Sequence, residues 1–440
     1  NYCGNFEKLK LDLIRYIKSG KTVILCVDDR NVVKRIVTYL ELDDIIFTDE
    51  NNIINIMREY KESFRSNYFK TDVLYASKAL SILHIYKLCK EEGLYADVVS
   101  MGEIYTALKA GMDPTHLYFH GNNKQIEELE YAISNGVVHI VIDSYADYCH
   151  IERVASSLNK KVSCLIRLNT GVEAHTHKFI VTSHIDSKFG MLIDSDDLNK
   201  TLKGIENSKN VILEGFHSHI GSQIFEIEGF YAAIDKLVTY LKNFKESMAL
   251  NLGGGFGARY TKDDHPMAVR DIVGLIVKHT EEKLKENGVT ISHLMIEPGR
   301  SIVCEAGTTL YTIGAVKHTP HREYYFIDGG MTDNIRPALY QAKYEGFIVG
   351  KEDSPKKIIT VAGKCCESGD IIMEDTKLSE AGEGDLLVVK STGAYGYSMF
   401  SNYNKALRPA VVFVSSSGDF LAVKRQTLED IIRGEVSENI

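Results

Sequence analysis

The run Val73-Leu74-Tyr75-Ala76-Ser77-Lys78-Ala79 places a short apolar strand directly before a serine and a lysine. A polar residue just past an apolar strand marks the position at which α/β barrels carry their active sites, the carboxyl ends of the parallel strands. A lysine that is partly desolvated there can act as an amine nucleophile and form a Schiff base. A surface lysine that opens a helix is the competing interpretation, and the position of Lys78 alone does not separate the two.

The same alternation of apolar, β-branched runs with amphipathic stretches repeats between about residue 48 and residue 315. Helix-like segments such as Ala79–Glu92, Gly102–Ala110 and Gly229–Asn243 have apolar residues at three- and four-residue steps. The predicted strands are Val73–Ala76, Asp97–Val99, His116–His120, Val138–Asp143, Val162–Asn169, Leu213–Ile220, Ala249–Gly253 and His293–Glu297. This pattern predicts a TIM-type (β/α)8 barrel over residues 48–315.

After Ala315 the pattern changes to strand-like runs separated by Gly, Asp and Ser turns. These runs are Tyr324–Ile327, Lys357–Val361, Asp385–Val389 and Ala410–Val414. They favour an antiparallel β domain over residues 316–440. A strand-like run at Thr22–Val27 precedes the first barrel unit, so we expect residues 1–47 to join this β domain. The chain is therefore predicted to be an α/β protein of two domains, one of which is divided in the sequence.

The composition excludes several classes of partner. The formal charge of -9 over 440 residues is spread without acidic or basic blocks, so we expect no binding to nucleic acid or to an anionic membrane. No apolar run approaches the roughly 18 residues of a membrane helix, and the first residues show no signal-peptide pattern. Eight cysteines without a C-x-x-C pair fit a reducing compartment. We expect a cytoplasmic protein that binds a small molecule.

Two further predicted strand ends suit a phosphate group. In the run Asn251-Leu252-Gly253-Gly254-Gly255-Phe256-Gly257, glycines follow a strand that is expected to be buried. Their backbone N–H groups can approach a phosphate without interference from a Cβ atom. Ser222, in His217-Ser218-His219-Ile220-Gly221-Ser222-Gln223, offers a hydroxyl at another strand end. Glycine-rich turns are common, so each signal alone is weak.

A carboxylate ends the eighth predicted strand, in Ile296-Glu297-Pro298-Gly299-Arg300. A carboxylate beside a heterocyclic nitrogen keeps that nitrogen protonated, and a protonated pyridine ring withdraws electrons from a carbanion on an attached substrate. Glu297 can be that carboxylate, although an ion pair between Glu297 and Arg300 is an alternative. His219 can likewise be a hydrogen-bonded core residue instead of a cofactor contact.

The predicted β domain carries polar groups of its own, in Arg336-Pro337-Ala338-Leu339-Tyr340, Cys366-Glu367-Ser368-Gly369-Asp370 and Gly393-Ala394-Tyr395-Gly396. Arg336 can bind a carboxylate through two hydrogen bonds, Glu367 can hold an ammonium group and Cys366 can donate a proton. Together these groups indicate a zwitterionic substrate. A buried, inert thiol is the alternative interpretation of Cys366.

These motifs together resemble the fold-type III pyridoxal phosphate decarboxylases, which have an alanine-racemase-like two-domain architecture, and among them the diaminopimelate decarboxylase family. The resemblance runs from about Asp49 to Leu421. It implies the decarboxylation of meso-2,6-diaminopimelate to L-lysine and CO2, the last step of lysine biosynthesis, with pyridoxal 5'-phosphate as cofactor. The first 45 residues or so resemble the usual lead-in of the family poorly, and their role stays open.

By matching position, the resemblance implies a role for each motif residue. It implies Lys78 as the Schiff-base lysine, His219 stacked on the cofactor ring and Cys366 as proton donor, and it implies no metal. Asp97 and Arg167 would form a charged pair near the Schiff base. The residues implied to surround the cofactor are Lys78, Asp97, His219, Ser222, Gly254, Gly255, Glu297, Gly299, Arg300 and Tyr395. Those implied to contact the substrate are Arg300, Arg336, Tyr340, Glu367 and Tyr395.

The resemblance also implies a homodimer with shared active sites, in which the loop with Cys366 and Glu367 reaches into the barrel of the partner. Decarboxylases of ornithine, arginine, carboxynorspermidine or a secondary metabolite share Lys78 and the glycine run, so only the β-domain loops indicate diaminopimelate. A non-catalytic regulator with the same fold is a further alternative. A racemase is disfavoured, because such an enzyme usually has an arginine near the pyridine nitrogen where this chain has Glu297.

Overall fold

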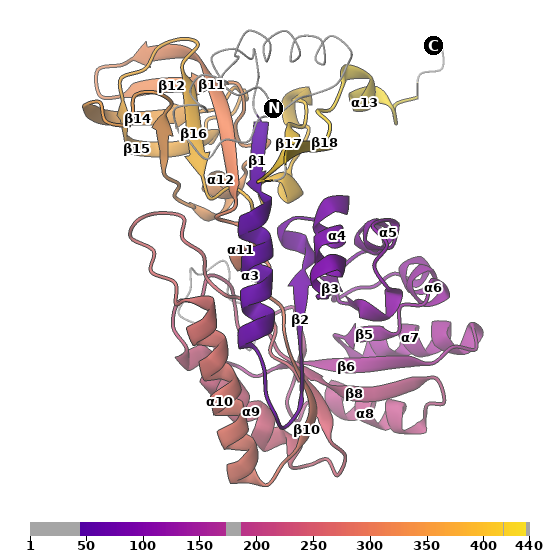
Figure 1. Ribbon diagram of the computed structural model, residues 1–440. Coiled ribbons are helices and arrows are strands. Elements are labelled where there is room, and N and C mark those ends of the chain that lie inside the picture. The colour runs from indigo at the N-terminus through magenta and orange to yellow at the C-terminus, as the bar shows by residue number, and fades with distance from the viewer. Residues whose placement is uncertain (1–44, 173–185, 417, 437–440) are drawn as a thin grey trace. The chain divides into compact units, whose positions relative to one another are not determined.

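The computed structural model describes residues 45–172, 186–416 and 418–436. The chain forms two compact units (Figure 1). The first unit comprises Asn1–Ile53, Arg259–Asp263 and Val303–Ile440, and the second comprises Ile54–Ala258 and Asp264–Ile302. The predicted strand Thr22–Val27 lies outside the described residues.

The second unit is a closed barrel of eight parallel strands. The ring closes because β10 pairs with β2 and β5 pairs with β6. Its strands are β2 (Lys70–Ala76), β3 (Tyr95–Val98), β4 (Leu117–Phe119), β5 (His139–Ile142), β6 (Val162–Asn169), β8 (Val211–His217), β9 (Met248–Asn251) and β10 (Ile291–Ile296). A short strand β7 (Met191–Leu192) adds to β6. All eight predicted barrel strands and the TIM-type fold are confirmed.

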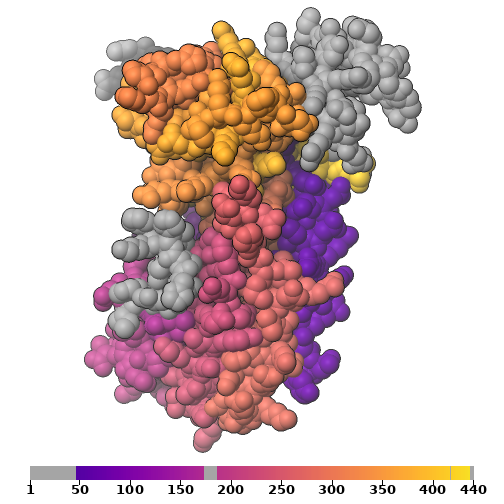
Figure 2. All heavy atoms as spheres, turned by 90° about the vertical axis from the view of Figure 1, so that its left-hand side faces the viewer, coloured from indigo at the N-terminus to yellow at the C-terminus, as the bar shows by residue number. Residues whose placement is uncertain are grey.

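Helices cover the outside of the barrel (Figure 1). They are α3 (Glu50–Ser63), α4 (Leu83–Glu92), α5 (Met101–Lys109), α6 (Ile126–Ser134), α7 (Tyr145–Ser157), α8 (Asp196–Asn207), α9 (Glu228–Leu241) and α10 (Val269–Asn287), with short 3-10 turns η1 (Ser77–Ala79) and η2 (Pro114–His116). Ser100 and Ser144 cap α5 and α7 by accepting hydrogen bonds from backbone N–H groups of the first turn. Figure 2 shows α9 and α10 side by side on one face of the barrel.

The barrel interior is packed with apolar side chains from six strands. They are Leu74, Tyr118, Val141, Leu165, Ala249 and Met295, and each of them is at most 2 % exposed. This filled interior leaves the carboxyl ends of the strands as the place where polar side chains can gather.

The first unit contains a nine-stranded sheet among its described residues. Its strands are β1 (Ile45–Asp49), β11 (Gly307–His318), β12 (Glu323–Ile327), β13 (Gly346–Ile348), β14 (Lys356–Ala362), β15 (Ile371–Ser379), β16 (Leu386–Lys390), β17 (Ala410–Ser415) and β18 (Gly418–Val423). Its short helices and turns are α12 (Arg336–Tyr340), η3 (Tyr397–Met399), η4 (Tyr403–Lys405) and α13 (Leu428–Ile432), while α11 (Arg300–Val303) spans the boundary between the units.

Two details of the predicted β domain need correction. The sheet is mostly antiparallel, but β1 pairs parallel with β17 and β12 pairs parallel with β14. The expected boundary at residue 315 falls inside β11, which pairs with β1, β12 and β16. Because a strand belongs to the sheet with which it pairs, the first unit resumes at Val303, earlier than the change in sequence pattern suggested.

Candidate active site

Lys78 lies in the turn η1, directly after the barrel strand β2, and its side chain is exposed. Strand β2 ends beside the loop after β10, because the Ala76 N–H donates to the Pro298 carbonyl (3.0 Å). Gly299 makes this approach possible, since a Cβ atom there would lie 2.8 Å from the Ala76 carbonyl oxygen. The Lys78 segment and the Glu297 segment, which are far apart in the sequence, therefore meet at one end of the barrel.

Glu297 follows β10 and is a buried carboxylate with three side-chain neighbours. Asn251, the last residue of β9, donates its Nδ2 to Glu297 Oε1 (2.7 Å). His120 Nε2 lies 3.0 Å from the same oxygen, and His217 Nε2 lies 3.2 Å from Oε2. Among the described residues, Oε1 thus has two nitrogen neighbours and Oε2 has one. A carboxylate oxygen can accept two hydrogen bonds, so Oε2 keeps room for a further donor.

The neighbouring rings fix the charge on Glu297. Burial alone would raise the pKa of this carboxyl group, but His120 and His217 hold the pKa well below its usual range. Burial lowers the pKa of His217 to about 4, so this ring is neutral. Burial also acts on His120, yet the carboxylates of Asp97 and Glu297 raise the pKa of His120 above its ordinary value. The pair His120 and Glu297 is therefore a buried ion pair.

The atoms of His120, His217 and Glu297 lie within 4.8 Å of one another, close enough to hold a metal ion. The contacts that already join these side chains account for the spacing. The three groups need no ion to explain why they gather.

The charged pair expected between Asp97 and Arg167 near the Schiff base stays a prediction. Arg167 Nη1 lies 3.9 Å from Asp143 Oδ1, and the ion-pair neighbour of Asp97 among the described residues is His120, at 3.9 Å. Arg167 still influences Asp97 electrostatically, since its charge lowers the pKa of this carboxyl group, which burial raises. Strand order explains the neighbour of Arg167: Arg167 lies on β6, next to β5, which ends just before Asp143.

The glycine run forms the turn after β9. A Cβ atom at Gly254 would lie 2.1 Å from the Glu297 carbonyl oxygen, and Gly255 has a φ of 101°. The Gly254 N–H donates to His219 Nδ1 (3.1 Å), so this amide orients the imidazole ring instead of pointing at a ligand. Within the described residues, no protein acceptor takes the Gly255 N–H. Gly255 is thus the member of the run whose amide can serve a phosphate.

His219 presents a neutral ring. Burial, together with the charges of Lys78 and Arg167, lowers the pKa of His219 well below its ordinary value. A neutral aromatic ring held at Nδ1 by a backbone amide is suited to stack on a flat ligand. The position of His219 at the cofactor stays a prediction.

An arginine and a serine lie together at the same barrel end. Arg300 Nη2 donates to Ser222 Oγ (3.0 Å), and the Arg300 side chain is buried. A fixed guanidinium group beside a hydroxyl group suits an anion.

In the first unit, Cys366 and Glu367 lie on an exposed loop that a buried aspartate holds. Asp370 accepts the Met331 N–H on Oδ1 (2.6 Å) and the Cys365 N–H on Oδ2 (2.8 Å). The Cys366 N–H donates to Asn404 Oδ1 (2.8 Å). Of the adjacent thiols, Cys366 is exposed, so the buried, inert interpretation of this thiol is wrong. The loop is therefore tied down on both sides of an accessible thiol.

Three other predicted substrate residues, Arg336, Tyr340 and Tyr395, also lie in the first unit. Arg336 is buried: its guanidinium group stacks on the ring of Tyr260 at 4.4 Å, and Nη1 donates to the Tyr344 hydroxyl (2.6 Å). Tyr340 is half-buried at the end of α12. Tyr395 is half-buried with a φ of 64°, an uncommon conformation for a tyrosine.

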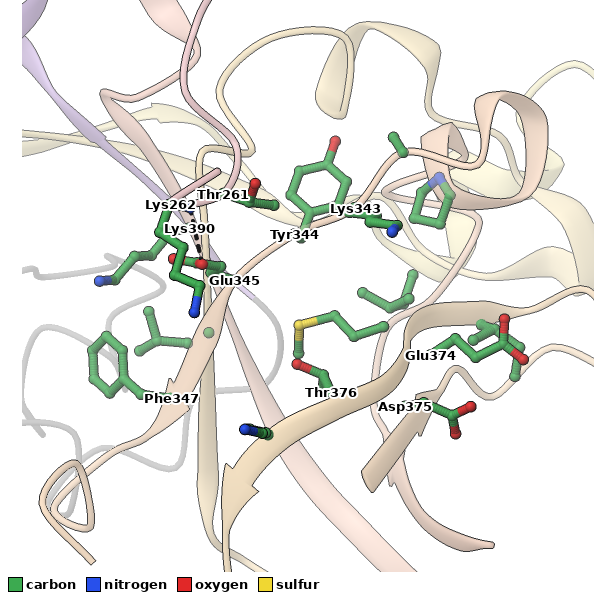
Figure 3. Close-up of a pocket in the computed structure, with 18 of the residues that line it drawn as sticks. Thr261, Lys262, Lys343, Tyr344, Glu345, Phe347, Glu374, Asp375, Thr376 and Lys390 are labelled. Carbon is green, nitrogen blue, oxygen red and sulfur yellow. Dashed lines mark hydrogen bonds between the residues drawn. The ribbon is translucent and has the colours of Figure 1, made fainter. Parts of the chain in front are cut away.

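A separate groove of about 1250 Å³ crosses the first unit (Figure 3). Figure 3 shows Lys262 and Lys390 on one side and Glu374 and Asp375 on the other. None of the predicted substrate residues lines it. The groove is therefore not the candidate active site.

The sequence interpretation missed four polar residues at the barrel end, namely His120, Asp143, His217 and Asn251. Each ends a barrel strand or follows it directly. The rule that singled out Lys78, a polar residue at the end of an apolar strand, would have found all four.

Comparison with known proteins gives consistent matches. Residues 50–304 match the family model described as pyridoxal-dependent decarboxylase, pyridoxal binding domain. A diaminopimelate decarboxylase of Bacillus subtilis (strain 168) is 45% identical over 383 residues, covering 86% of this chain and 87% of the relative. The crystal structure of a diaminopimelate decarboxylase from M. jannaschii with L-lysine has a TM-score of 0.85 at 32% identity, covering 92% of this chain and 94% of that one. No helix among the described residues is long and apolar enough to cross a membrane.

Proposed function

The chain belongs to the pyridoxal-dependent decarboxylases and, within them, to the diaminopimelate decarboxylase family, and from this premise we propose how its own residues carry out the reaction. The protein is a carboxy-lyase that removes one carboxylate of meso-2,6-diaminopimelate as CO2 and leaves L-lysine, the last step of lysine biosynthesis. Pyridoxal phosphate, when bound, supplies the electron sink for the bond that breaks.

The residues at the barrel end fit this cofactor. Glu297 is a buried, ionised carboxylate with acceptor capacity left on Oε2, which suits a protonated ring nitrogen. Ser222, Arg300 and the Gly255 N–H suit a phosphate group. Lys78 would offer the amine for the cofactor aldehyde, and the neutral ring of His219 would provide an aromatic face for the cofactor.

The first unit supplies most of the groups for the substrate. Arg336 binds the distal carboxylate, Glu367 holds the distal ammonium group and the Cys366 thiol returns a proton to the α-carbon after CO2 has left. Burial, followed by the charge of Asp370, raises the pKa of Cys365 to about 11, so the neighbouring thiol stays protonated and does not compete as a base. Arg300 of the second unit and Tyr340 and Tyr395 of the first complete the proposed substrate contacts.

We further propose that the active site is shared in a homodimer, with the Cys366 loop of one chain serving the barrel of its partner. Support comes from the exposure of Cys366 and Glu367 on a loop that is nevertheless held in place. Mixing Lys78→Ala and Cys366→Ala proteins tests this idea, because random pairing restores one complete site in half of the dimers, about a quarter of normal activity. No recovery after mixing and refolding would contradict sharing.

A cytoplasmic location is proposed on the state of the thiols. Every cysteine in the described part of the chain is free, as expected in a reducing compartment. Labelling intact cells with a thiol reagent that does not cross membranes should leave Cys149 and Cys366, both exposed, unmodified.

The observation that carries the proposed function is the buried, ionised Glu297 at the barrel end that also bears Lys78. The purified protein with pyridoxal phosphate should release CO2 from diaminopimelate, and from ornithine, arginine or lysine at least a hundredfold more slowly, as expected when a buried arginine is left unpaired. Release from ornithine but not from diaminopimelate would contradict the proposed substrate. Lys78→Ala should lack the visible absorbance of the lysine-bound cofactor.

A further inference from the structure

His120 is a buried, charged side chain for which the proposed mechanism has no role. It follows β4 directly, and its N–H donates to the Val98 carbonyl (2.8 Å), so its backbone continues the pairing of β4 with β3. Its side chain is only 6% exposed. Burying a histidine as a cation is costly unless its charge is compensated, so its surroundings must explain its presence.

Two carboxylates face the imidazole ring of His120 from different strands. Nε2 lies 3.0 Å from Glu297 Oε1, after β10, and 3.9 Å from Asp97 Oδ1, on β3. The ring of His217, from β8, lies edge-on to it with centroids 4.9 Å apart, and Arg167, from β6, adds a positive charge nearby. His120 is thus the cation between two acids that would otherwise repel each other.

We propose that His120 is a positioning residue: its imidazolium ring bridges Asp97 and Glu297, holds Glu297 in place through Oε1, and thereby leaves Oε2 to receive the N–H of the cofactor ring. The proposal rests on the proposed function for its last step, because only a pyridoxal-type ring brings that N–H. The bridge itself belongs to the protein alone.

The neighbours of Glu297 support different roles for its two oxygens, with Oε1 held by the protein and Oε2 left for the cofactor. Asn251 Oδ1 accepts the Gly253 N–H (2.9 Å), which orients the Asn251 amide so that its Nδ2 points at Oε1. Asn251 and His120 therefore both approach Oε1, while the neutral ring of His217 is the neighbour of Oε2. The Asn251 hydrogen bond and the charge of His120 thus both act on Oε1, which favours one orientation of the carboxylate.

The charge on His120 also affects the reaction. Without it, Asp97 and Glu297 would be two buried carboxylates with no cation between them, and one of them would take up a proton. A protonated Glu297 could not hold the positive charge of a pyridinium ring. Replacing His120 by a neutral residue should therefore weaken cofactor binding and shift its pH dependence, even though His120 does not touch the cofactor itself.

The first test uses the protein without cofactor. In protein labelled with ¹⁵N-histidine, the His120 signal, assigned by its loss in His120→Asn, should show a titration midpoint above 6.5, the ordinary value of a histidine. Glu297→Gln should lower that midpoint. A neutral His120 ring throughout, or a midpoint that Glu297→Gln does not move, would overturn the proposal.

The second test measures cofactor affinity by absorbance titration. His120→Asn and His120→Gln should bind pyridoxal phosphate roughly ten- to hundredfold more weakly, because each leaves Glu297 without its buried cationic partner. The matched control is His139→Asn, because His139 Nδ1 contacts Glu214 Oε2 (2.7 Å) in a similar pair on other strands of the same barrel.

The two tests separate the possible failures. Unchanged affinity in both His120 variants, or an equal loss in the control, would overturn the proposed role of His120. If the wild-type protein bound no pyridoxal phosphate at all, the proposed function would fail, while the protonation of His120 in the cofactor-free protein would still decide whether the bridge exists.

Discussion

Replacing Asp370 by asparagine tests whether the loop that carries Cys366 must be held in place for the reaction. The two oxygens of Asp370 accept backbone N–H groups of Met331 and Cys365. An asparagine keeps one acceptor but turns an NH2 group toward the other amide, so two donors face each other. We expect the loop to detach on one side while the fold of the unit persists.

The magnitude follows from the lost contact. A hydrogen bond from an amide to a buried charged group is worth roughly 1.5–3 kcal/mol, and the facing donors add to the loss. If that energy is what keeps the Cys366 thiol in position, the ordered fraction of the loop falls about ten- to hundredfold. The rate of CO2 release at saturating diaminopimelate should fall by the same factor, provided that proton return limits turnover.

The assay combines turnover with two measurements that should not change. Asp370→Asn should bind pyridoxal phosphate normally, because the residues proposed to hold the cofactor in the barrel, such as Lys78 and Glu297, belong to the second unit. Its thermal midpoint should fall by only a few degrees. Asp375→Asn, an exposed carboxylate of the same unit, serves as the matched control.

Two results would refute this reasoning. Turnover within about twofold of the wild type would mean that the loop holds its position without Asp370. A loss of cofactor binding equal to the loss of turnover would mean that the substitution damages the whole protein. Asn404→Ala, which removes the acceptor of the Cys366 N–H, should reproduce the lower turnover and gives an independent check.

Burial raises the pKa of Glu103 from 4.5 to about 7; the folded state then binds a proton that the unfolded state has lost, so stability falls as pH rises between these values, and Glu103→Gln should remove that slope in thermal unfolding. Gly254→Ala should cost more than about 2 kcal/mol and weaken cofactor binding, because its Cβ would meet a backbone carbonyl oxygen at 2.1 Å, whereas Gly274→Ala on helix α10 meets nothing and should be neutral or stabilising. Lys124→Met should destabilise the barrel by roughly 3–5 kcal/mol in denaturant unfolding, because it leaves Asp147 as a buried charge without its partner at 2.6 Å.

The barrel was predictable because its strands are local features of the sequence. Strands of a parallel barrel are buried on both faces, so they read as short continuous apolar runs, as in Val162–Asn169, which matches β6 at both ends. The first unit was harder to predict. Strand β11 pairs with three other strands. Its first half is mostly buried, whereas most residues of its second half are exposed. Such a strand has no regular alternation by which the sequence could mark its beginning.

In the candidate site, the positions of residues at strand ends were predictable from the sequence, whereas the contacts between residues of different strands were not. The positions of Lys78 and Glu297 follow from the strand ends, which the sequence reveals. The ion-pair neighbour of Arg167 depends on which carboxylate its side chain reaches across neighbouring strands. Asp143 lies 3.9 Å away, and the charged pair with Asp97 near the Schiff base stays a prediction. Residue type gives the charge that is available, while strand order in the closed sheet decides which charges meet.

The histidines at the barrel end show why residue type alone does not assign a role. His120, His217 and His219 all lie close to strand ends, and a sequence gives each of them the same ordinary pKa. Burial lowers the pKa of His217 and His219, so both rings are neutral, whereas two carboxylates raise the pKa of His120. Chemically identical side chains thus become a neutral ring held by a backbone amide, a neutral neighbour of Glu297 and a cation. The difference depends on which carboxylates lie opposite each ring, so a chain that kept all three histidines but lost Asp97 and Glu297 would lack the charges that favour the cationic form of His120.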